Sequence, residues 1–412
     1  MGSNQFINEA WLASLDLHLT GQGYSYRTRW TYLAEAKRFL DYLAERHRPV
    51  REVTLQDVSS YMRRELRRLQ ASRTHTTIRT RLAYSAHESN RMLLRQAQGQ
   101  WPPTPVLSTP LAAFHWGLCR EYASWLAGVH GLATGTISSR QEEARRFMAW
   151  LGERATQENI THLSTHTVDS YIKFRTTTLC RHARKALATE LRSFLKYLHL
   201  TGCISHNLAA SVLAPKLYNF EDLPSALSDD EIRRVIRLTH EDHSVQGIRD
   251  YAIVMLLSTY GLRDSEVTHL RLEDIDWRHQ TLRILRTKVA TESVLPLLVP
   301  VGEAILAYLR NARPHTTIRE LFLRSVAPYR PLCNLYQLVR TRITEAGIVR
   351  KSKWGSHAFR HGRAIGLLRA GVPTKQIADV LGHHSVTSTN VYLRLATEDL
   401  RAVALEIPED AP

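Results

Sequence analysis

Apolar residues recur at helical spacing along most of the first 200 positions, and this pattern predicts a largely helical chain. In the segment 24–46, apolar side chains lie three or four positions apart, so they share one face of a helix whose other face is basic. These side chains are Tyr32, Leu33, Ala36, Phe39, Leu40 and Leu43. A turn around Pro49 and a second helix follow.

The same plan returns about 110 positions later. Residues 143–154, EARRFMAWLGER, resemble residues 35–46, EAKRFLDYLAER, with an offset of 147 − 39 = 108 at their phenylalanines. The tyrosines Tyr61 and Tyr171 downstream give an offset of 171 − 61 = 110. The near-constant offset favours a duplicated helical module, although two basic amphipathic helices can also resemble each other by chance.

Two proline-containing stretches interrupt the periodic pattern, at 98–110 and 213–226. Proline and polar residues between periodic segments are typical of linkers. We therefore expect three domains, at residues 1–104, 105–218 and 219–412.

The third of these domains mixes helices and strands. Ser228 and Glu231 have the spacing of a capping box at a helix start. Residues 251–261 are apolar almost throughout, which predicts a buried helix that ends at its terminal glycine. Residues 276–298 alternate between apolar and polar around a polar turn, which predicts a small antiparallel sheet. The fold class expected is mainly α with a small antiparallel β-sheet, an α+β arrangement in the last domain.

Composition narrows the possible partners. The 412 residues carry 55 Lys and Arg against 39 Asp and Glu, a formal charge of +16, which suits a polyanion such as DNA or RNA. The four cysteines are scattered without a metal-ligand or disulfide spacing, and neither a signal peptide nor a membrane span is evident. We expect a cytoplasmic, nucleoid-associated protein without a membrane partner.

Candidate chemistry gathers between Trp354 and Leu395, where the turn residues Gly371, Pro373 and Gly382 predict three short helical segments. Ser356 is expected to cap the first of them. The segments carry the polar side chains His357, Arg360, His361, His383 and Tyr392.

These residue types together suit attack on a phosphodiester. Arginine is permanently charged and its rigid fork of N–H donors matches two phosphate oxygens. Histidine adds donors or a proton shuttle near neutral pH, and a tyrosine hydroxyl becomes a nucleophile once electrostatic help removes its proton. Arg263, with Glu266 three positions on to orient it, and Lys288 in the predicted hairpin turn extend the set.

Each of these residues also has a simpler interpretation. Arg263 with its carboxylate is a common helix-start arrangement, Lys288 alone is typical of a solvated turn, and His383 alone is typical of a helix end. A histidine metal site is disfavoured, because no thiol or carboxylate joins at ligand spacing and Arg360 would repel a cation.

In order along the chain, these residues resemble the catalytic set of the tyrosine recombinase (phage integrase) family. The resemblance covers residues 228–412, and the helical module at 113–215 is similar to the family's core-binding domain. The additional helical module at 1–104, for DNA binding or subunit interaction, is a departure from the family plan. The predicted hairpin is a second departure, because Lys288 lacks the flanking glycines usual in the family.

The resemblance implies a role for each matched residue. Tyr392 would attack the scissile phosphate to form a 3′-phosphotyrosyl bond, and Arg263 and Arg360 would clamp the non-bridging oxygens. Lys288 would be the general acid, His357 a base or donor, and His383 a donor to phosphate. Glu266 and His361 would support the others. No cofactor and no metal ion are implied.

The implied partners are double-stranded DNA and three further copies of the chain, a homo-tetramer on two DNA sites, with or without accessory recombinases. Basic side chains expected to contact DNA are Lys37, Arg38, Arg145, Arg146, Arg181, Arg184 and Lys185. The duplicated module favours a recombinase that integrates, excises or transposes a mobile element. The alternatives are a type IB topoisomerase, a non-catalytic DNA-binding architectural protein, and an RNA-binding or structural helical protein.

Overall fold

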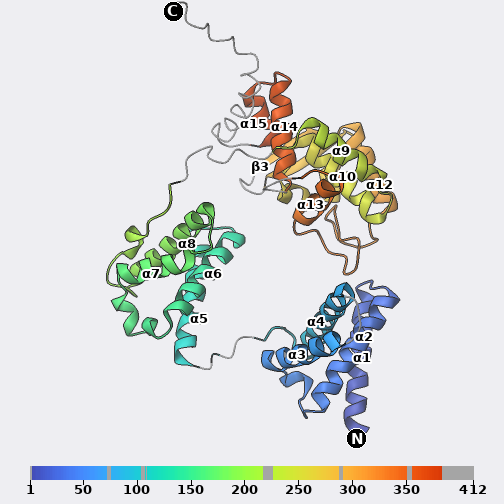
Figure 1. Cartoon of the computed structure of the whole chain (residues 1–412). Coiled ribbons are helices and arrows are strands. Elements are labelled where there is room, and N and C mark those ends of the chain that lie inside the picture. The colour runs from blue at the N-terminus through green and yellow to red at the C-terminus, as the bar shows by residue number, and fades with distance from the viewer. Residues whose placement is uncertain are drawn as a thin grey trace, which may run out of the picture. The chain divides into compact units, whose positions relative to one another are not determined.

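The computed structural model describes residues 2–71, 76–103, 107, 109–216, 226–286, 291–349 and 355–382. The chain divides into two compact units, Met1–Pro103 together with Asp222–Pro412, and Thr104–Glu221. Helices dominate the described residues, whose strands form one three-stranded antiparallel sheet (Figure 1). The predicted fold class, mainly helical with a small antiparallel sheet, is confirmed.

The described residues up to 103 form four α-helices, α1 (Gly2–Gly21), α2 (Tyr26–Ala44), α3 (Leu55–Ala71) and α4 (Thr76–Gln98), and a short 3-10 helix, Val50–Glu52. Helix α2 begins where the hydroxyl of Ser25 accepts a hydrogen bond from the Thr28 N–H group. Its apolar stripe, including Phe39, Leu40 and Leu43, is buried as the periodicity predicted. This stripe packs into a core with residues of the other helices.

The unit Thr104–Glu221 also contains four α-helices among its described residues, drawn in green in Figure 1. They are α5 (Pro110–Gly128), α6 (Thr134–Leu151), α7 (Thr165–Thr176) and α8 (Arg181–Leu200). Their core is rich in aromatic rings, among them Tyr122 and Phe194, whose centroids lie 5.0 Å apart in an edge-to-face arrangement. Three short 3-10 helices, Gly152–Ala155, Asn159–His162 and Leu208–Ser211, complete it.

The two four-helix modules match at the positions where their sequences match. Phe39 meets Tyr61 with ring centroids 4.9 Å apart at 61°, and Phe147 meets Tyr171 at 4.8 Å and 62°. Each module also buries the glutamate four positions before its phenylalanine. The two modules thus share helix order, this ring pair and this buried glutamate, while their origin by duplication stays a prediction.

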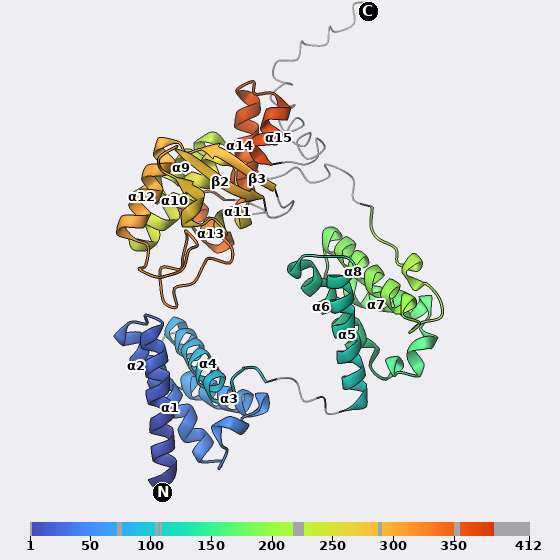
Figure 2. The same ribbon diagram turned by 180° about the vertical axis from the view of Figure 1, so that it is seen from behind.

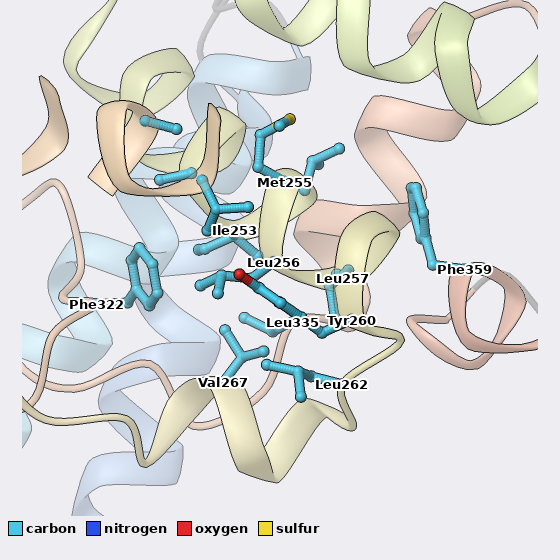
Figure 3. Packing of buried hydrophobic residues seen from close by; sticks show 14 of the residues in the cluster. Ile253, Met255, Leu256, Leu257, Tyr260, Leu262, Val267, Phe322, Leu335 and Phe359 are labelled. Carbon is cyan, nitrogen blue, oxygen red and sulfur yellow. The ribbon is translucent and has the colours of Figure 1, made fainter. Parts of the chain in front are cut away.

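The C-terminal part is built on helix α10 (Val245–Tyr260). Ala252 to Leu257 are all buried, and Figure 3 shows the side chains of this helix among Phe322, Leu335 and Phe359. Around it lie α9 (Asp229–Glu241), α11 (Asp264–Thr268), α12 (Val299–Asn311), α13 (Tyr336–Glu345), α14 (His357–Arg369) and α15 (Thr374–Leu381). The capping box at the start of α9 is present in both directions, as predicted.

The sheet follows the predicted alternation. Strands β1 (Ile275–Asp276), β2 (Thr281–Arg286) and β3 (Thr291–Pro296) pair in that order, and both pairings are antiparallel. On β2 the side chains at 282, 284 and 286 point inward and are buried. Figure 2 shows β2 and β3 in the C-terminal part, with α11 next to β2.

The expectation that Ser356 caps α14 with its side chain is wrong. Ser356 is in the N-cap position, but its backbone is already helical, with φ −50° and ψ −27°, and its hydroxyl makes no capping hydrogen bond. A side-chain cap requires an extended backbone at this position, which directs the hydroxyl toward the first free N–H groups. The buried Ser356 instead provides the backbone carbonyl that receives the N–H groups of Phe359 and Arg360.

Candidate active site

The site begins where helix α10 stops. Gly261 adopts a left-handed backbone with φ 63°, so the chain turns sharply and presents Arg263 at the start of α11. A β-carbon at Gly261 would lie 2.7 Å from a methyl group of Leu381, the last residue of α15. Position 261 therefore needs a glycine for two reasons: the left-handed turn, and the close approach of the ends of α10 and α15.

Arg263 is held from two sides. Its Nη1 donates to Oε1 of Glu266 at 2.7 Å, and its backbone N–H donates to Oε2 of the same carboxylate at 2.8 Å. Its Nη2 donates to the carbonyl of Gly382 at 3.0 Å. The sequence-based prediction that Glu266 orients Arg263 is matched by these contacts, and the side chain of Arg263 keeps 20% of its surface exposed.

The carboxyl of Glu266 stays ionised. Burial raises the pKa of Glu266, but the hydrogen bond from the Arg263 backbone and the positive charges of Arg286 and Arg263 outweigh burial and lower it below its usual value. A charged carboxylate at this place accepts from both guanidinium groups.

Arg360 reaches the same place from helix α14. It is buried, with 2% of its surface exposed, and donates from Nη1 to the carbonyl of Gly261 at 2.8 Å and from Nη2 to the carbonyl of Leu381 at 2.5 Å. The carbonyls held by Arg360 and Arg263 at the end of α15 belong to consecutive residues, Leu381 and Gly382. The structure thus brings together two arginines that are 97 positions apart, from 360 − 263 = 97.

Histidines line the first turns of α14. The rings of His357 and His361 stack with centroids 6.0 Å apart at 28°; His357 is exposed and His361 is partly buried. His357 lies three positions before Arg360 on α14, so these two residues share a helix face. Within the described ranges, no group of three His, Cys, Asp or Glu side chains has an arrangement that could hold a metal ion.

Lys288, His383 and Tyr392 lie outside the described residues. Described residues end two positions before Lys288 and directly before His383, and Tyr392 has no described neighbour in the sequence. Arg286 and Thr291 form the last register pair of β2 and β3, so the hairpin connection containing Lys288 starts beside the site. Helix α15 ends at Leu381 with Gly382 as its left-handed cap, directly before His383.

Sequence reasoning missed Arg286. Its side chain is 1% exposed and its Nη1 donates to Oε2 of Glu266 at 3.0 Å, which adds a third arginine to the group. The signal was present in the alternation of β2, because position 286 falls on the inward face with Leu282 and Ile284. An arginine at an inward position of a short strand needs a buried partner.

The basic residues expected to contact DNA have different surroundings. Lys37 is exposed, whereas Arg38 pairs with the buried Glu35. Arg145 lies 5.1 Å over the ring of Trp116, and Arg146 pairs with Glu142 and Glu143. Arg181, Arg184 and Lys185 are all exposed at the start of α8. Of these seven side chains, Arg38 is partly buried and the other six are exposed.

Comparison with known proteins agrees with this geometry. The family model described as the phage integrase family matches residues 225–399. A protein of Sinorhizobium fredii, provisionally named integrase/recombinase y4gC, is 53% identical over 186 residues, which are 45% of this chain and 97% of that protein. The chain belongs to the phage integrase (tyrosine recombinase) family. This recombinase is therefore an enzyme, and its function is site-specific DNA recombination.

Two further similarities extend beyond the catalytic part. Tyrosine recombinase XerD of Corynebacterium glutamicum is 28% identical over 298 residues, 69% of this chain and 96% of that protein. The structure of the XerH site-specific recombinase, solved as a post-cleavage complex with a palindromic difH substrate, has a TM-score of 0.55 at 16% identity. It covers 84% of this chain and 95% of that one, and the likeness shows a shared fold. Among the described residues, every helix is too short or too polar to span a membrane.

Proposed function

We propose that the recombinase cuts and rejoins DNA through a covalent bond between Tyr392 and the 3′ phosphate of the broken strand. Tyr392 gives its hydroxyl proton to a base, His357, and its oxygen attacks the scissile phosphorus. The bond from phosphorus to the 5′ oxygen breaks, and the leaving oxygen takes a proton from Lys288. One phosphoester bond forms as another breaks, so the reverse attack by a 5′-hydroxyl reseals a strand without an external energy source.

The observation that carries this proposal is the convergence of Arg263 and Arg360. Both guanidinium groups end at neighbouring carbonyls of one helix terminus, although they come from different helices. Two guanidinium groups fixed on adjacent carbonyls suit the two non-bridging oxygens of one phosphodiester. They also stabilise the charge that develops in the transition state. In phosphoryl-transfer enzymes with metal ions, the metal supplies that stabilisation.

The histidines have secondary roles in this mechanism. His357, exposed on the first turn of α14, acts as a base or a further donor to phosphate, and His383 donates to a phosphate oxygen. Glu266 and His361 support the catalytic groups by contact, Glu266 through its two bonds to Arg263.

We further propose a division of labour along the chain. Residues 105–218 form the core-binding domain and residues 219–412 the catalytic domain, and together they hold double-stranded DNA mainly through its phosphates. Residues 1–104 form an additional module for DNA or for a neighbouring subunit. The working assembly is a homo-tetramer on two DNA sites. The relative named integrase/recombinase y4gC supports a role in moving a DNA element.

A covalent-trapping experiment tests the mechanism. A nicked duplex carrying the ends of the recombinase's own DNA element loses a short fragment after cleavage, so a protein–DNA adduct accumulates. Wild type is expected to give the adduct and Tyr392→Phe none, since the substitution removes the nucleophilic oxygen. Tyr336→Phe, which alters a tyrosine of α13 that is 45% exposed, is the matched control and is expected to react like wild type. An adduct with Tyr392→Phe would refute the assignment.

A second substrate distinguishes recombination from the alternative activity, nicking and resealing by a type IB topoisomerase. Two duplexes of different length, each with one recombination site, yield recombinant products only if strands are exchanged between sites. Relaxation of supercoiled DNA without any recombinant product would favour the topoisomerase.

A further inference from the structure

Arg286 is a buried charge on a strand that otherwise points apolar side chains inward. It occupies the last inward position of β2 and is the largest of the fully buried side chains, with 1% of its surface exposed. An arginine is always ionised, so its removal from water is unfavourable unless several partners replace its hydrogen bonds to solvent. Arg286 meets this need with protein acceptors for all three nitrogens of its guanidinium group.

Three partners surround the Arg286 guanidinium, and each belongs to a different element. Nη1 donates to Oε2 of Glu266 on α11 at 3.0 Å, and Nε donates to Oγ of Ser293 on β3 at 3.2 Å. Nη2 donates to the carbonyl of Val380 on α15 at 2.8 Å. One planar group therefore fixes the hairpin, the helix that starts at Arg263, and the helix that leads to His383.

The hydrogen bond to Val380 is one of three in which consecutive carbonyls at the end of α15 each accept from an arginine. The carbonyls of Val380, Leu381 and Gly382 accept from Arg286, Arg360 and Arg263 in that order, at 2.8, 2.5 and 3.0 Å. The last carbonyls of a helix have no partner within the helix, and cations at this end are favourable. All three are here held by side chains of β2, α14 and the α10–α11 turn.

The turn at Gly382 packs directly against the guanidinium group of Arg286. A β-carbon on Gly382 would lie 2.7 Å from Nε and 2.9 Å from Cζ of Arg286, so the backbone of the turn rests directly on the planar group. A movement of Arg286 would consequently move Gly382, and with it the carbonyl that Arg263 uses.

We propose that Arg286 is a positioning residue for DNA cleavage, acting through Glu266 on Arg263 and through the α15 terminus on the turn before His383. This inference rests on the proposed function of those residues. Arg286 sets the rate of the chemical step and leaves DNA affinity unchanged, because all three nitrogens of its guanidinium group already donate within the protein.

A matched control is available in the same unit. Arg342 on α13 is also buried, and its Nη2 lies 2.8 Å from Oδ2 of Asp250 and 2.8 Å from Oδ2 of Asp242. Its carboxylate partners are distinct from Glu266, so a substitution there measures the general effect of disturbing a buried arginine. Arg286→Lys and Arg342→Lys keep the charge and remove the planar fork in equal measure.

The test measures single-turnover adduct formation on the nicked duplex, DNA affinity by titration, and the folded fraction by thermal unfolding. Arg286→Lys is expected to slow cleavage by roughly 100-fold, the effect of a misplacement of about 1 Å in a catalytic group, with DNA affinity unchanged. Arg342→Lys is expected to cleave at the wild-type rate per folded molecule. Equal rates for the two variants per folded molecule would overturn the proposal.

A double-variant comparison separates positioning from stability. If Arg286 acts through Arg263, then adding Arg286→Lys to Arg263→Ala should slow cleavage far less than it slows wild type. Full additivity of the two effects contradicts the proposal. If Arg286→Lys does not fold, Ser293→Ala carries the test: a several-fold slower cleavage supports positioning, and an unchanged rate overturns it. Failure of wild type to form an adduct would instead refute the proposed function.

Discussion

At the scale of single residues, two glycines decide where Arg263 and Arg360 lie. Gly261 and Gly382 end α10 and α15 with the same left-handed backbone, φ 63° in both cases. Neither has room for a side chain, because Gly261 is pressed against Leu381 and Gly382 against Arg286. Their lack of a β-carbon is what allows Arg360 to span both helix ends.

Gly382→Ala is expected to impair both stability and cleavage. The left-handed backbone alone costs an alanine about 1–3 kcal/mol, and the new methyl group would also displace Arg286. Gly371→Ala is the control, since Gly371 has φ 77° but a β-carbon there would meet nothing within 4 Å among the described residues. Chemical denaturation and adduct formation should show a loss of stability in both variants and slowed cleavage only in Gly382→Ala. Normal cleavage by Gly382→Ala would contradict this account.

At the scale of elements, Glu266 joins α11 to strand β2, because its carboxylate accepts hydrogen bonds from both Arg263 and Arg286. Local signals in the sequence predicted the elements themselves: the capping box of α9, the glycine that ends α10 and the alternation of the hairpin. They could not predict which distant elements meet, so the contact of Arg286 with Val380, 94 positions on, was missed. The wrong expectation for Ser356 has a similar origin, because side-chain capping depends on the incoming backbone.

The ion pairs of Glu266 make this region sensitive to acid. Its folded pKa is lowered, so its contribution to stability is complete above the unfolded pKa of about 4.3 and is lost as pH falls through the folded value. Denaturant midpoints measured from pH 7 to pH 3 should therefore fall more steeply for wild type than for Glu266→Gln. Parallel curves would show that Glu266 contributes no proton-linked stability.

At the scale of the whole molecule, the chain carries two modules of the same four-helix plan. The repeat was visible in the sequence, because Phe39 and Tyr61 have counterparts at 147 and 171, and the ring pairs then proved equal in geometry. In both modules the buried glutamate pairs with the arginine three positions on, Glu35 with Arg38 and Glu143 with Arg146, and Glu143 also pairs with Arg175 at 3.0 Å.

Deleting residues 1–104 distinguishes the two roles proposed for the first module. If it binds DNA, the protected footprint should shorten, and the slope of log affinity against log salt should decrease by about 0.9 for each phosphate that is no longer bound. An unchanged footprint and slope would favour contacts between subunits. Thermal unfolding of the truncated protein shows whether the remaining chain is folded.

The sharing of Glu266 has one more consequence. Two guanidinium groups, those of Arg263 and Arg286, draw on one carboxylate, so a surplus of one positive charge remains between them. Backbone carbonyls orient these groups but carry no full counter-charge. The excess positive charge is accessible to solvent at Arg263, because the side chain of Arg263 is 20% exposed and that of Arg286 is 1% exposed. Arg263 is therefore the group at which a phosphodiester would restore the balance of charge.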